Sequence, residues 1–398
     1  MVRSERLAEV AAALVLVVGM GFGRFAFTGL YPVMVAGGQL SLTGGSYAAS
    51  ANYAGYLVGA LLTAALSSIP SRTLCTISIA ATVLTLALLA LPQPEWLVVV
   101  IRGLSGLASA VTMVAASRWL LSDRGQQNGS PALFSGVGIG ILFSAELIAA
   151  GSVLSLSSHS IWLVLGLACL VCGGVAIVLQ VVLEKDKRPS RDSRRDEDKP
   201  GTVGARRLIA IYALAGFGYI ITATYLPLLV KETIAPIDPV HVWAVFGAAA
   251  IPSCFLWHRL HMQWGTNLSL CVNLVIQGIG VALPLLHAPV PYLLSALLVG
   301  GTFMGTVTIA MPAARRVAHM LRLNIIAIMT AAYGFGQIIG PLIANYLFAQ
   351  TQAFDASLAA AALVLILAAA LCVPVVDTNK SAASYPPSVG AGQNRRNG

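Results

Sequence analysis

Residues 21–35 read GFGRFAFTGLYPVMV and place one arginine, Arg24, inside an apolar run that is long enough to cross a lipid bilayer. A charged side chain at the centre of a membrane costs about 2.5 to 3.5 kcal/mol on insertion scales, so it usually faces a partner or a water-filled cavity. The stretch therefore predicts a membrane-spanning helix in which Arg24 has either a functional or a structural role.

The same pattern recurs later in the chain. Gly216-Phe217-Gly218 and Pro227 to Val230 match Gly21-Phe22-Gly23 and Pro32 to Val35 at an offset of 195, nearly half of the 398 residues. Further matches at offsets of 196 and 197 pair Gly138, Gly140 and Ser144 with Gly334, Gly336 and Gly340, and Gly103 and Arg118 with Gly300 and Arg315. The chain is thus predicted to contain two copies of one unit.

Composition identifies the class of protein. Hydrophobic residues make up 57% of the chain and charged residues 10%, whereas soluble domains have about 25% charged residues. The chain is therefore predicted to be an integral membrane protein in a lipid bilayer. The net charge is +9, but what it indicates about a partner depends on which side of the membrane the charged residues lie. No nucleic-acid partner is predicted. Cys169 and Cys172 are interpreted as small buried side chains.

Apolar runs of about 20 residues, the length needed to span a bilayer as a helix, occur in two groups of six. None alternates polar and apolar residues as a barrel strand would. The runs lie near residues 8–35, 46–68, 73–91, 95–117, 131–154 and 160–183, and then near 208–230, 238–257, 266–287, 291–314, 323–348 and 355–376.

Basic residues give the orientation, because Lys and Arg gather in cytoplasmic connections. With these spans, 21 of the 24 Lys and Arg residues fall on one side, the exceptions being Arg24, Arg102 and Lys231. Both termini are therefore predicted to be cytoplasmic. The predicted units are an N-terminal six-helix bundle (1–183), a cytoplasmic linker (184–207), a C-terminal six-helix bundle (208–376) and a disordered cytoplasmic tail (377–398). Two such parallel repeats are an architecture of transporters, with the site between the halves.

Two motifs support this architecture. Arg102-Gly-Leu-Ser105-Gly106 resembles the fourth-helix motif of the major facilitator superfamily, and Gly336-Gln-Ile-Ile-Gly340-Pro341 is similar to its helix-packing motif. Within that superfamily, residues 23–34 and 50–59 resemble the bacterial YbfB/YjiJ-type branch. The resemblance implies an all-α membrane protein with twelve transmembrane helices in two pseudo-symmetric six-helix halves.

Two departures from the superfamily pattern weaken a specific assignment. The connection between the second and third spans, Ser67 to Arg72, lacks the expected acidic residue. In the fifth span, Ser144-Ala145 stands where antiporters have Gly-Pro. An exchange mechanism is therefore a weaker prediction than transport itself.

Arg24 lies on a polar stripe of the first span. Gly21, Arg24, Thr28 and Tyr31 share one helix face, and Arg24 lies roughly 17 Å from the outer end, near the midplane. Its guanidinium is expected to bind a carboxylate- or phosphate-bearing substrate through paired hydrogen bonds. Thr28 and Tyr31, on the same face, are also predicted to bind the substrate. The alternative is a structural arginine that caps backbone carbonyls exposed by the glycines.

Polar side chains on other spans are expected to line the same cavity, although each alone is also typical of interhelical hydrogen bonding. They are Asn52, Tyr56, Tyr219, Thr222, Tyr225, Asn273, Gln277, Thr302, Tyr333 and Gln337. Tyr219 matches Arg24 in the repeat, so contacts with a charged solute are expected to be concentrated in the N-terminal half.

Glu146 is the one acidic residue embedded in a predicted span. Because the fourth and fifth spans run antiparallel, Arg102 and Glu146 are expected at nearly equal depth and are predicted to form an ion pair. Competition between a proton and Arg102 for Glu146 would couple protonation to transport. A permanent structural ion pair is the open alternative.

No nucleophile and base, and no His/Cys cluster, occurs at a credible spacing. The chain is therefore predicted to be neither an enzyme nor a cofactor- or metal-binding protein. The glycine-rich segments follow no strand and indicate close helix packing.

The predicted function is secondary active transport of a small organic solute across the bacterial inner membrane. Arg24 indicates an anionic or zwitterionic solute, and the aromatic and amide residues would also suit a neutral one. Protons are the expected coupling ion, the direction is open with export favoured over uptake, and a monomer is expected. The alternative is a membrane sensor or scaffold that does not transport.

Overall fold

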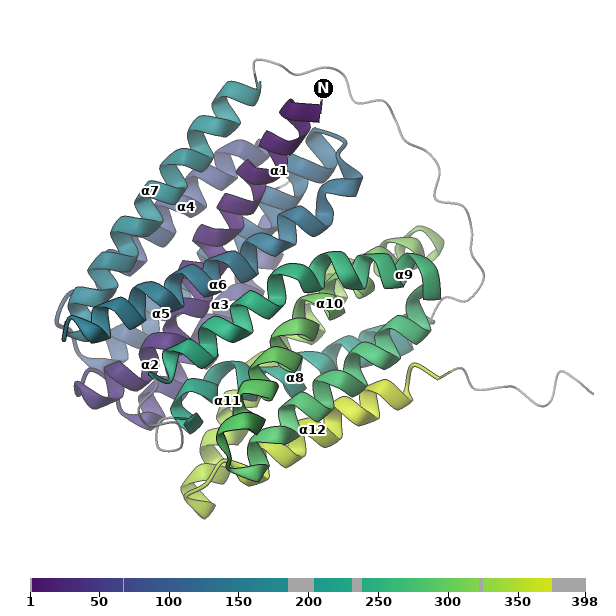
Figure 1. Cartoon of the computed structure of the whole chain (residues 1–398). Coiled ribbons are helices and arrows are strands. Elements are labelled where there is room, and N and C mark those ends of the chain that lie inside the picture. The colour runs from purple at the N-terminus through teal and green to yellow at the C-terminus, as the bar shows by residue number, and fades with distance from the viewer. Residues whose placement is uncertain (1, 67, 185–203, 231–237, 322–324, 374–398) are drawn as a thin grey trace, which may run out of the picture.

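The computed structural model describes residues 2–66, 68–184, 204–230, 238–321 and 325–373, and within these ranges the chain forms helices and no strand (Figure 1). Most of the predicted linker and the whole of the predicted tail lie outside the described residues. The prediction of an all-α membrane protein is confirmed. Eight helical segments of the described chain are long and apolar enough to cross a membrane.

The first repeat, as the term is used below, comprises residues 2–184. Its first span is continuous but changes helix type twice, from α1 to a π-helix and back. The elements are α1 (Val2–Leu16), the π-helix η1 (Val17–Phe25), α2 (Ala26–Ala36), α3 (Leu42–Ala65), α4 (Ser71–Leu89), α5 (Glu95–Ser117), the π-helix η2 (Arg118–Asp123), the 3-10 turn η3 (Gln127–Gly129), α6 (Ser130–Val153) and α7 (Ser158–Glu184).

The second repeat comprises residues 205–373. Its elements are α8 (Ala205–Val230), α9 (Val240–Ala282), the 3-10 turn η4 (Leu283–Leu286), α10 (Pro289–Leu321), α11 (Ile325–Thr351) and α12 (Asp355–Ala370). Pro227 lies inside α8 as its repeat mate Pro32 lies inside α2.

The count of twelve separate helices is not confirmed, because the spans predicted at 238–257 and 266–287 are joined in α9. Its backbone breaks at Gly265, where φ is 77° and ψ is 178°, a conformation that glycine adopts without steric cost. The two arms have different neighbours, since Gly247 packs against Ile141 and Leu142 of α6 and Gly278 packs against Ile366 of α12. One helix therefore supplies two packing units.

The predicted internal repeat recurs as equivalent helix crossings. A Cβ at Gly140 of α6 would lie 2.7 Å from the Cα of Gly21, and a Cβ at Gly336 of α11 would lie 3.2 Å from the carbonyl carbon of Gly216. Small residues at these crossings let two helix backbones approach closely, as is common where helices pack in membranes. The glycine matches found in the sequence thus have the same packing role in both repeats.

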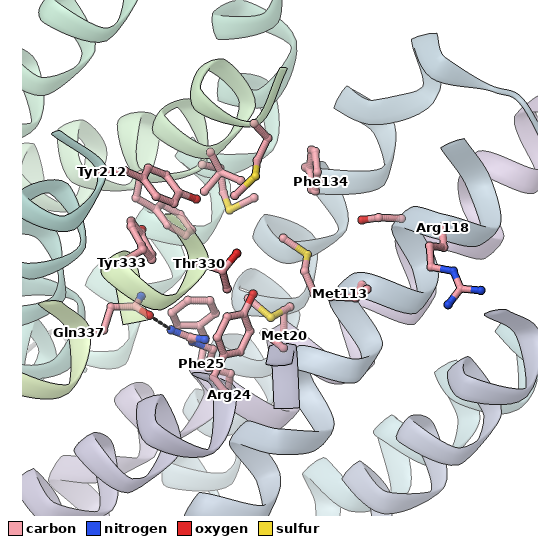
Figure 2. A pocket seen from close by; sticks show the side chains of 18 of the residues that line it. Met20, Arg24, Phe25, Met113, Arg118, Phe134, Tyr212, Thr330, Tyr333 and Gln337 are labelled. Atoms are coloured by element: carbon pink, nitrogen blue, oxygen red, sulfur yellow. Dashed lines mark hydrogen bonds between the residues drawn. The ribbon is translucent and has the colours of Figure 1, made fainter. Parts of the chain in front are cut away.

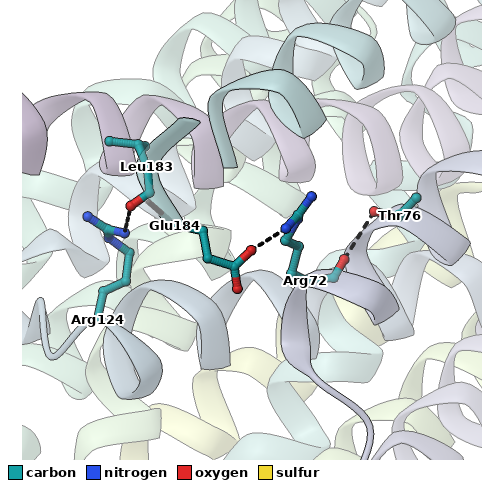
Figure 3. Close-up of polar contacts among 5 residues, drawn as sticks. All are labelled: Arg72, Thr76, Arg124, Leu183 and Glu184. Atoms are coloured by element: carbon teal, nitrogen blue, oxygen red, sulfur yellow. Dashed lines mark hydrogen bonds and ion pairs between the residues drawn. The ribbon is translucent and has the colours of Figure 1, made fainter. Parts of the chain in front are cut away.

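Contacts between helix ends define two sides of the first repeat. On the linker side, Arg72 at the start of α4 forms an ion pair with Glu184 at the end of α7, and Arg124 donates to the Leu183 carbonyl at 3.1 Å (Figure 3). On the opposite side, called the far side below, Gln39 donates to the Leu89 carbonyl at 3.2 Å. The acid missing from the loop before Arg72 is thus replaced by Glu184.

Three pairs of helices make the most extensive contacts between the two repeats. α3 packs against α11, α6 against the first arm of α9, and α2 against α8. Figure 1 shows the first repeat, in purple and blue, beside the second repeat, in green and yellow. The site described next lies where these two groups of helices face each other.

Candidate functional site

The π-helix η1 carries Arg24 and is held by side chains of α5. A π-helix is wider than an α-helix and is often found at functional sites. Ser109 donates to the Gly19 carbonyl at 2.6 Å, and Ser105 donates to the Gly23 carbonyl. Arg102 donates through Nη1 to the Gly23 carbonyl at 2.9 Å and through Nη2 to the Arg24 carbonyl at 3.1 Å.

The predicted Arg102–Glu146 ion pair is wrong. Arg102 is buried, turns toward η1 and lies 4.4 Å above the ring centroid of Phe27. The Glu146 side chain is 49% exposed and lies 3.3 Å from Nδ1 of His241, at the start of α9. The two residues were expected at the same depth in the membrane, but their side chains do not face each other. Arg102 points toward the first span, and Glu146 points toward the second repeat.

Arg24 is itself buried, with 3% of its surface exposed, and contacts both repeats. Its guanidinium lies 4.1 Å from the ring centroid of Tyr56 and 4.9 Å from that of Tyr53. Nη2 donates to Oε1 of Gln337 in α11 at 2.9 Å, while Nε and Nη1 have no acceptor. Capping of the η1 carbonyls, the structural alternative for Arg24, is therefore carried out by Arg102.

Arg24 lies at the inner end of a cavity of about 230 Å³ between the two repeats (Figure 2). The cavity extends from Arg24 to Arg118, Leu121 and Ser122 in η2, on the linker side. Figure 2 shows Tyr212 and Tyr333 on one wall and Met113 and Phe134 on the other. The other lining residues are Met20, Phe25, Tyr56, Ala60, Val114, Ser117, Tyr219, Phe303, Met304, Val307, Met311, Thr330 and Gln337.

The wall from the second repeat is aromatic. The Tyr212 and Tyr333 rings stack with centroids 4.4 Å apart, and Tyr219 stacks on Tyr333 at 5.8 Å and on Phe303 at 5.7 Å. Such ring pairs have a preferred geometry and present a flat apolar surface. The cavity thus combines a cation from the first repeat with an aromatic wall from the second.

Beyond Arg24, toward the far side, hydrogen bonds join the two repeats. Thr28 donates to the Ala223 carbonyl at 2.9 Å, and Trp243 donates to the Phe25 carbonyl at 3.2 Å. Further cross-repeat bonds pair Ser46 with Tyr225 at 2.7 Å, Tyr53 with Thr224 at 3.1 Å, and Ser50 with the Ile338 carbonyl at 3.1 Å. The repeats are therefore in close contact on the far side and separated by the cavity on the linker side.

Of the thirteen residues predicted to bind substrate, the structure brings five together around the cavity. These are Arg24, Tyr56, Tyr219, Tyr333 and Gln337. Their role in binding stays a prediction, but their convergence from four different helices is an observation.

The other eight lie outside the cavity lining. Thr28 and Tyr225 belong to the far-side contacts, and Tyr31 donates to the Leu42 carbonyl at 2.7 Å. Asn52 donates to the Arg102 carbonyl at 2.9 Å, and Asn273 donates to the Thr302 carbonyl at 3.0 Å. Thr302 bonds carbonyls of its own helix, and Thr222 and Gln277 are fully buried.

Several lining residues were missed by sequence reasoning. Tyr212 precedes Tyr219 by seven residues, two helix turns, so helical periodicity indicates it in retrospect. Phe303 and the four methionines Met20, Met113, Met304 and Met311 have no polar atom that would distinguish them from core or lipid-facing residues.

The charged residues of the cavity lining, Arg24 and Arg118, both come from the first repeat, and the described lining contains no carboxylate. Arg118 donates to the Ile69 carbonyl at 3.3 Å. No group of three or more His, Cys, Asp or Glu side chains among the described residues could hold a metal ion. The described lining thus combines two arginines with an aromatic surface.

Comparison with known proteins identifies the family of this chain. No curated protein matches the chain. A family model described as uncharacterised MFS-type transporter YbfB matches residues 16–373, which include most of the first repeat, all of the second repeat and the whole cavity lining. The chain therefore belongs to the YbfB family of the major facilitator superfamily and is a multi-pass membrane protein of transporter type.

Proposed function

We propose that this protein moves a small organic anion with an apolar, preferably aromatic, body across the membrane. The observation that carries the proposal is Arg24, a buried cation at the end of the cavity whose Nε and Nη1 lack acceptors. A buried donor without an acceptor costs about 1 to 3 kcal/mol, and more when it is charged. A carboxylate would supply acceptors to this cation, because the planar guanidinium presents paired N–H donors that match its two oxygens.

The surroundings of Arg24 favour an anion over a cation. Tyr56 and Tyr53, whose ring faces would attract a cationic solute, already have the Arg24 guanidinium over them. The described lining contains no carboxylate to balance a positive solute. The stacked rings of Tyr212 and Tyr333 and the adaptable methionines favour a flat apolar body.

The arrangement of the repeats supports transport by alternating access. The far-side hydrogen bonds close one side of the site, while the cavity extends toward the other. Counting the two arms of α9 as successive spans gives the twelve crossings expected from the sequence. With the basic residues on the cytoplasmic side of a bacterial inner membrane, both termini are cytoplasmic and the cavity faces the cytoplasm.

The proton gradient is the proposed energy source, and export is the favoured direction. Arg102 has no part in this proposal. Glu146 of α6 and His241 of α9 form an ionisable pair that joins the two repeats, so protonation of Glu146 would weaken a contact that has to break when the far side opens.

The proposal is tested by thermal-shift titration of the purified protein with a panel of aromatic carboxylates and their neutral amides. Carboxylates are expected to raise the melting temperature of the wild type and to have little effect on Arg24→Gln. Arg6→Gln, which removes an exposed arginine at the start of α1, is the matched control.

Flux in reconstituted vesicles then separates the two functions predicted from the sequence. Carboxylate flux that depends on a pH gradient supports transport, whereas Arg24-dependent binding without flux supports a sensor. Equal stabilisation of wild type and Arg24→Gln by carboxylates and amides would contradict the proposed role of Arg24.

A further inference from the structure

A chain of hydrogen bonds crosses from the first repeat to the second at the inner end of the cavity. Arg24 in η1 donates through Nη2 to Oε1 of Gln337 in α11 at 2.9 Å, and Nε2 of Gln337 donates to the Tyr219 hydroxyl in α8. All three side chains are buried and all three line the cavity. Gln337 is thus the residue through which the buried cation contacts the second repeat.

The position of these hydrogen bonds distinguishes them from the other contacts between the repeats. The bonds of Thr28 with Ala223 and of Ser46 with Tyr225 lie farther toward the far side. The bond from Arg24 to Gln337 lies at the boundary between that contact region and the cavity, where a solute would arrive (Figure 2).

The chemistry of Gln337 makes its bond replaceable. Its carboxamide oxygen is a neutral acceptor, so the contact leaves the positive charge of Arg24 unbalanced. A carboxylate accepts a stronger hydrogen bond from a guanidinium than a neutral carboxamide oxygen does, because its negative charge is attracted to the positive charge of the donor. An anion that reaches Arg24 therefore competes with Oε1 of Gln337, whereas a neutral analogue of the same shape does not.

We propose that Gln337 occupies Arg24 in the empty protein and that the solute anion displaces it, so that binding removes a hydrogen-bonded contact between the two repeats. This inference rests on the proposed function and assigns two roles to one residue. Gln337 sets the preference for anions, because it holds the cation without neutralising it. It also makes the contact between Arg24 and Tyr219 depend on whether the site is occupied.

The test is isothermal titration of the full-length protein with phenylacetate, which has one ring and one carboxylate, and with its neutral match phenylacetamide. Gln337→Met removes the competing acceptor and is expected to bind phenylacetate at least about tenfold more tightly, because the hydrogen bond that no longer has to be broken has a charged donor. Gln337→Glu places a permanent anion beside Arg24 and is expected to weaken phenylacetate binding by more than about tenfold. The affinity for phenylacetamide is expected to change little in both variants.

The matched control is Gln180→Met, which alters an equally buried glutamine on α7, outside the cavity lining; it is expected to leave the affinity for phenylacetate unchanged. Tyr219→Phe offers a second variant should Gln337→Met fail to fold. It removes the acceptor of Gln337 Nε2 and is also expected to tighten phenylacetate binding, by a smaller factor.

A purely structural Gln337 that positions Arg24 predicts the opposite order. Weaker or unchanged phenylacetate binding by both Gln337→Met and Tyr219→Phe, while the wild type binds it in an Arg24-dependent way, would overturn the inference and leave the proposed function intact. Failure of the wild type to bind phenylacetate or any other tested aromatic carboxylate through Arg24 would reject the proposed function, and the inference with it.

Discussion

The first span of the first repeat and α8 of the second occupy equivalent places but differ in backbone and charge. The first span changes into the π-helix η1 over Val17–Phe25, whereas α8 is α-helical throughout, over Ala205–Val230. At the offset of 195, Arg24 in η1 corresponds to Tyr219 in α8. The two equivalent side chains meet through Gln337.

The helices that pack against these spans differ in the same way. At the offset of 197, Arg102, Ser105 and Ser109 of α5 correspond to Val299, Thr302 and Thr306 of α10. The first three donate to carbonyls of η1. In the second repeat, Thr302 donates to carbonyls of its own helix and Thr306 donates to Oδ1 of Asn273 at 2.7 Å.

The comparison teaches that helix packing and polar chemistry have diverged to different extents. The glycine crossings are retained, since Gly140 meets Gly21 and Gly336 meets Gly216. The π-helix and the arginine that supports it belong to the first repeat. The buried cation of the site thus depends on a local backbone feature that the second repeat does not share.

Removing the support of η1 is expected to have the largest effect. Arg102→Met leaves the Gly23 and Arg24 carbonyls without their charged donor, and each such hydrogen bond contributes about 1.5 to 3 kcal/mol. The expected result is a loss of several kcal/mol of stability, seen as loss of the monodisperse peak in size-exclusion chromatography of detergent-solubilised protein. Arg102→Lys, which keeps one charged donor, is expected to restore part of the folded yield. Normal stability of Arg102→Met would show that η1 does not need α5.

The crossings that the repeats share are expected to respond alike and somewhat less. A Cβ at Gly140 would lie 2.7 Å from the Gly21 Cα, and one at Gly336 would lie 2.5 Å from the Ala213 carbonyl oxygen. Gly140→Ala and Gly336→Ala are each expected to lower stability by about 1 to 3 kcal/mol through overpacking, measured as a lower melting temperature. Gly174→Ala is the control, because nothing lies within 4 Å of a Cβ there. Unequal losses at Gly140 and Gly336 would break the equivalence of the two crossings.

The smallest effect on stability is expected at Glu146, whose repeat mate is Leu342. The Glu146–His241 pair is about half exposed, and exposed pairs contribute about 0.2 to 1 kcal/mol. Glu146→Gln is therefore expected to keep its melting temperature and its solute exchange in vesicles. Accumulation driven by a pH gradient is expected to fall if the proposed coupling role is right, because Gln cannot accept the proton. Unchanged gradient-driven accumulation with an unchanged pH profile would exclude Glu146 from coupling.

The helical membrane fold, the repeat and the position of Arg24 beside a cavity could be predicted from the sequence because each leaves a local signal. Apolar runs of fixed length and matching glycines report the spans and their crossings, and a charge in an apolar run is conspicuous whatever the tertiary structure. The join of two spans in α9 left no such signal. A single glycine, Gly265, turns the backbone there, and the sequence gives no means of telling it from an ordinary loop glycine.

The site was predicted only in part, because the direction in which a side chain points depends on how its helix is rotated about its own axis. Residue spacing along one helix does not give that rotation relative to the neighbouring helices. Asn273 and Gln337 are similar amides in apolar spans, yet Asn273 bonds within its repeat and Gln337 reaches Arg24. The Arg102–Glu146 prediction failed for the same reason. Residue counts indicate how deep a side chain lies in the membrane, but they do not indicate the direction in which it points.

The far-side hydrogen bonds between the repeats affect how the rate of transport depends on temperature. In the proposed cycle, the bonds of Thr28 with Ala223, Ser46 with Tyr225 and Tyr53 with Thr224 have to break together before the opposite side opens. Breaking several buried bonds at once gives the conformational step a large activation enthalpy. Turnover is therefore expected to rise steeply with temperature, far more steeply than diffusion through an open pore, and an Arrhenius plot of flux would show it.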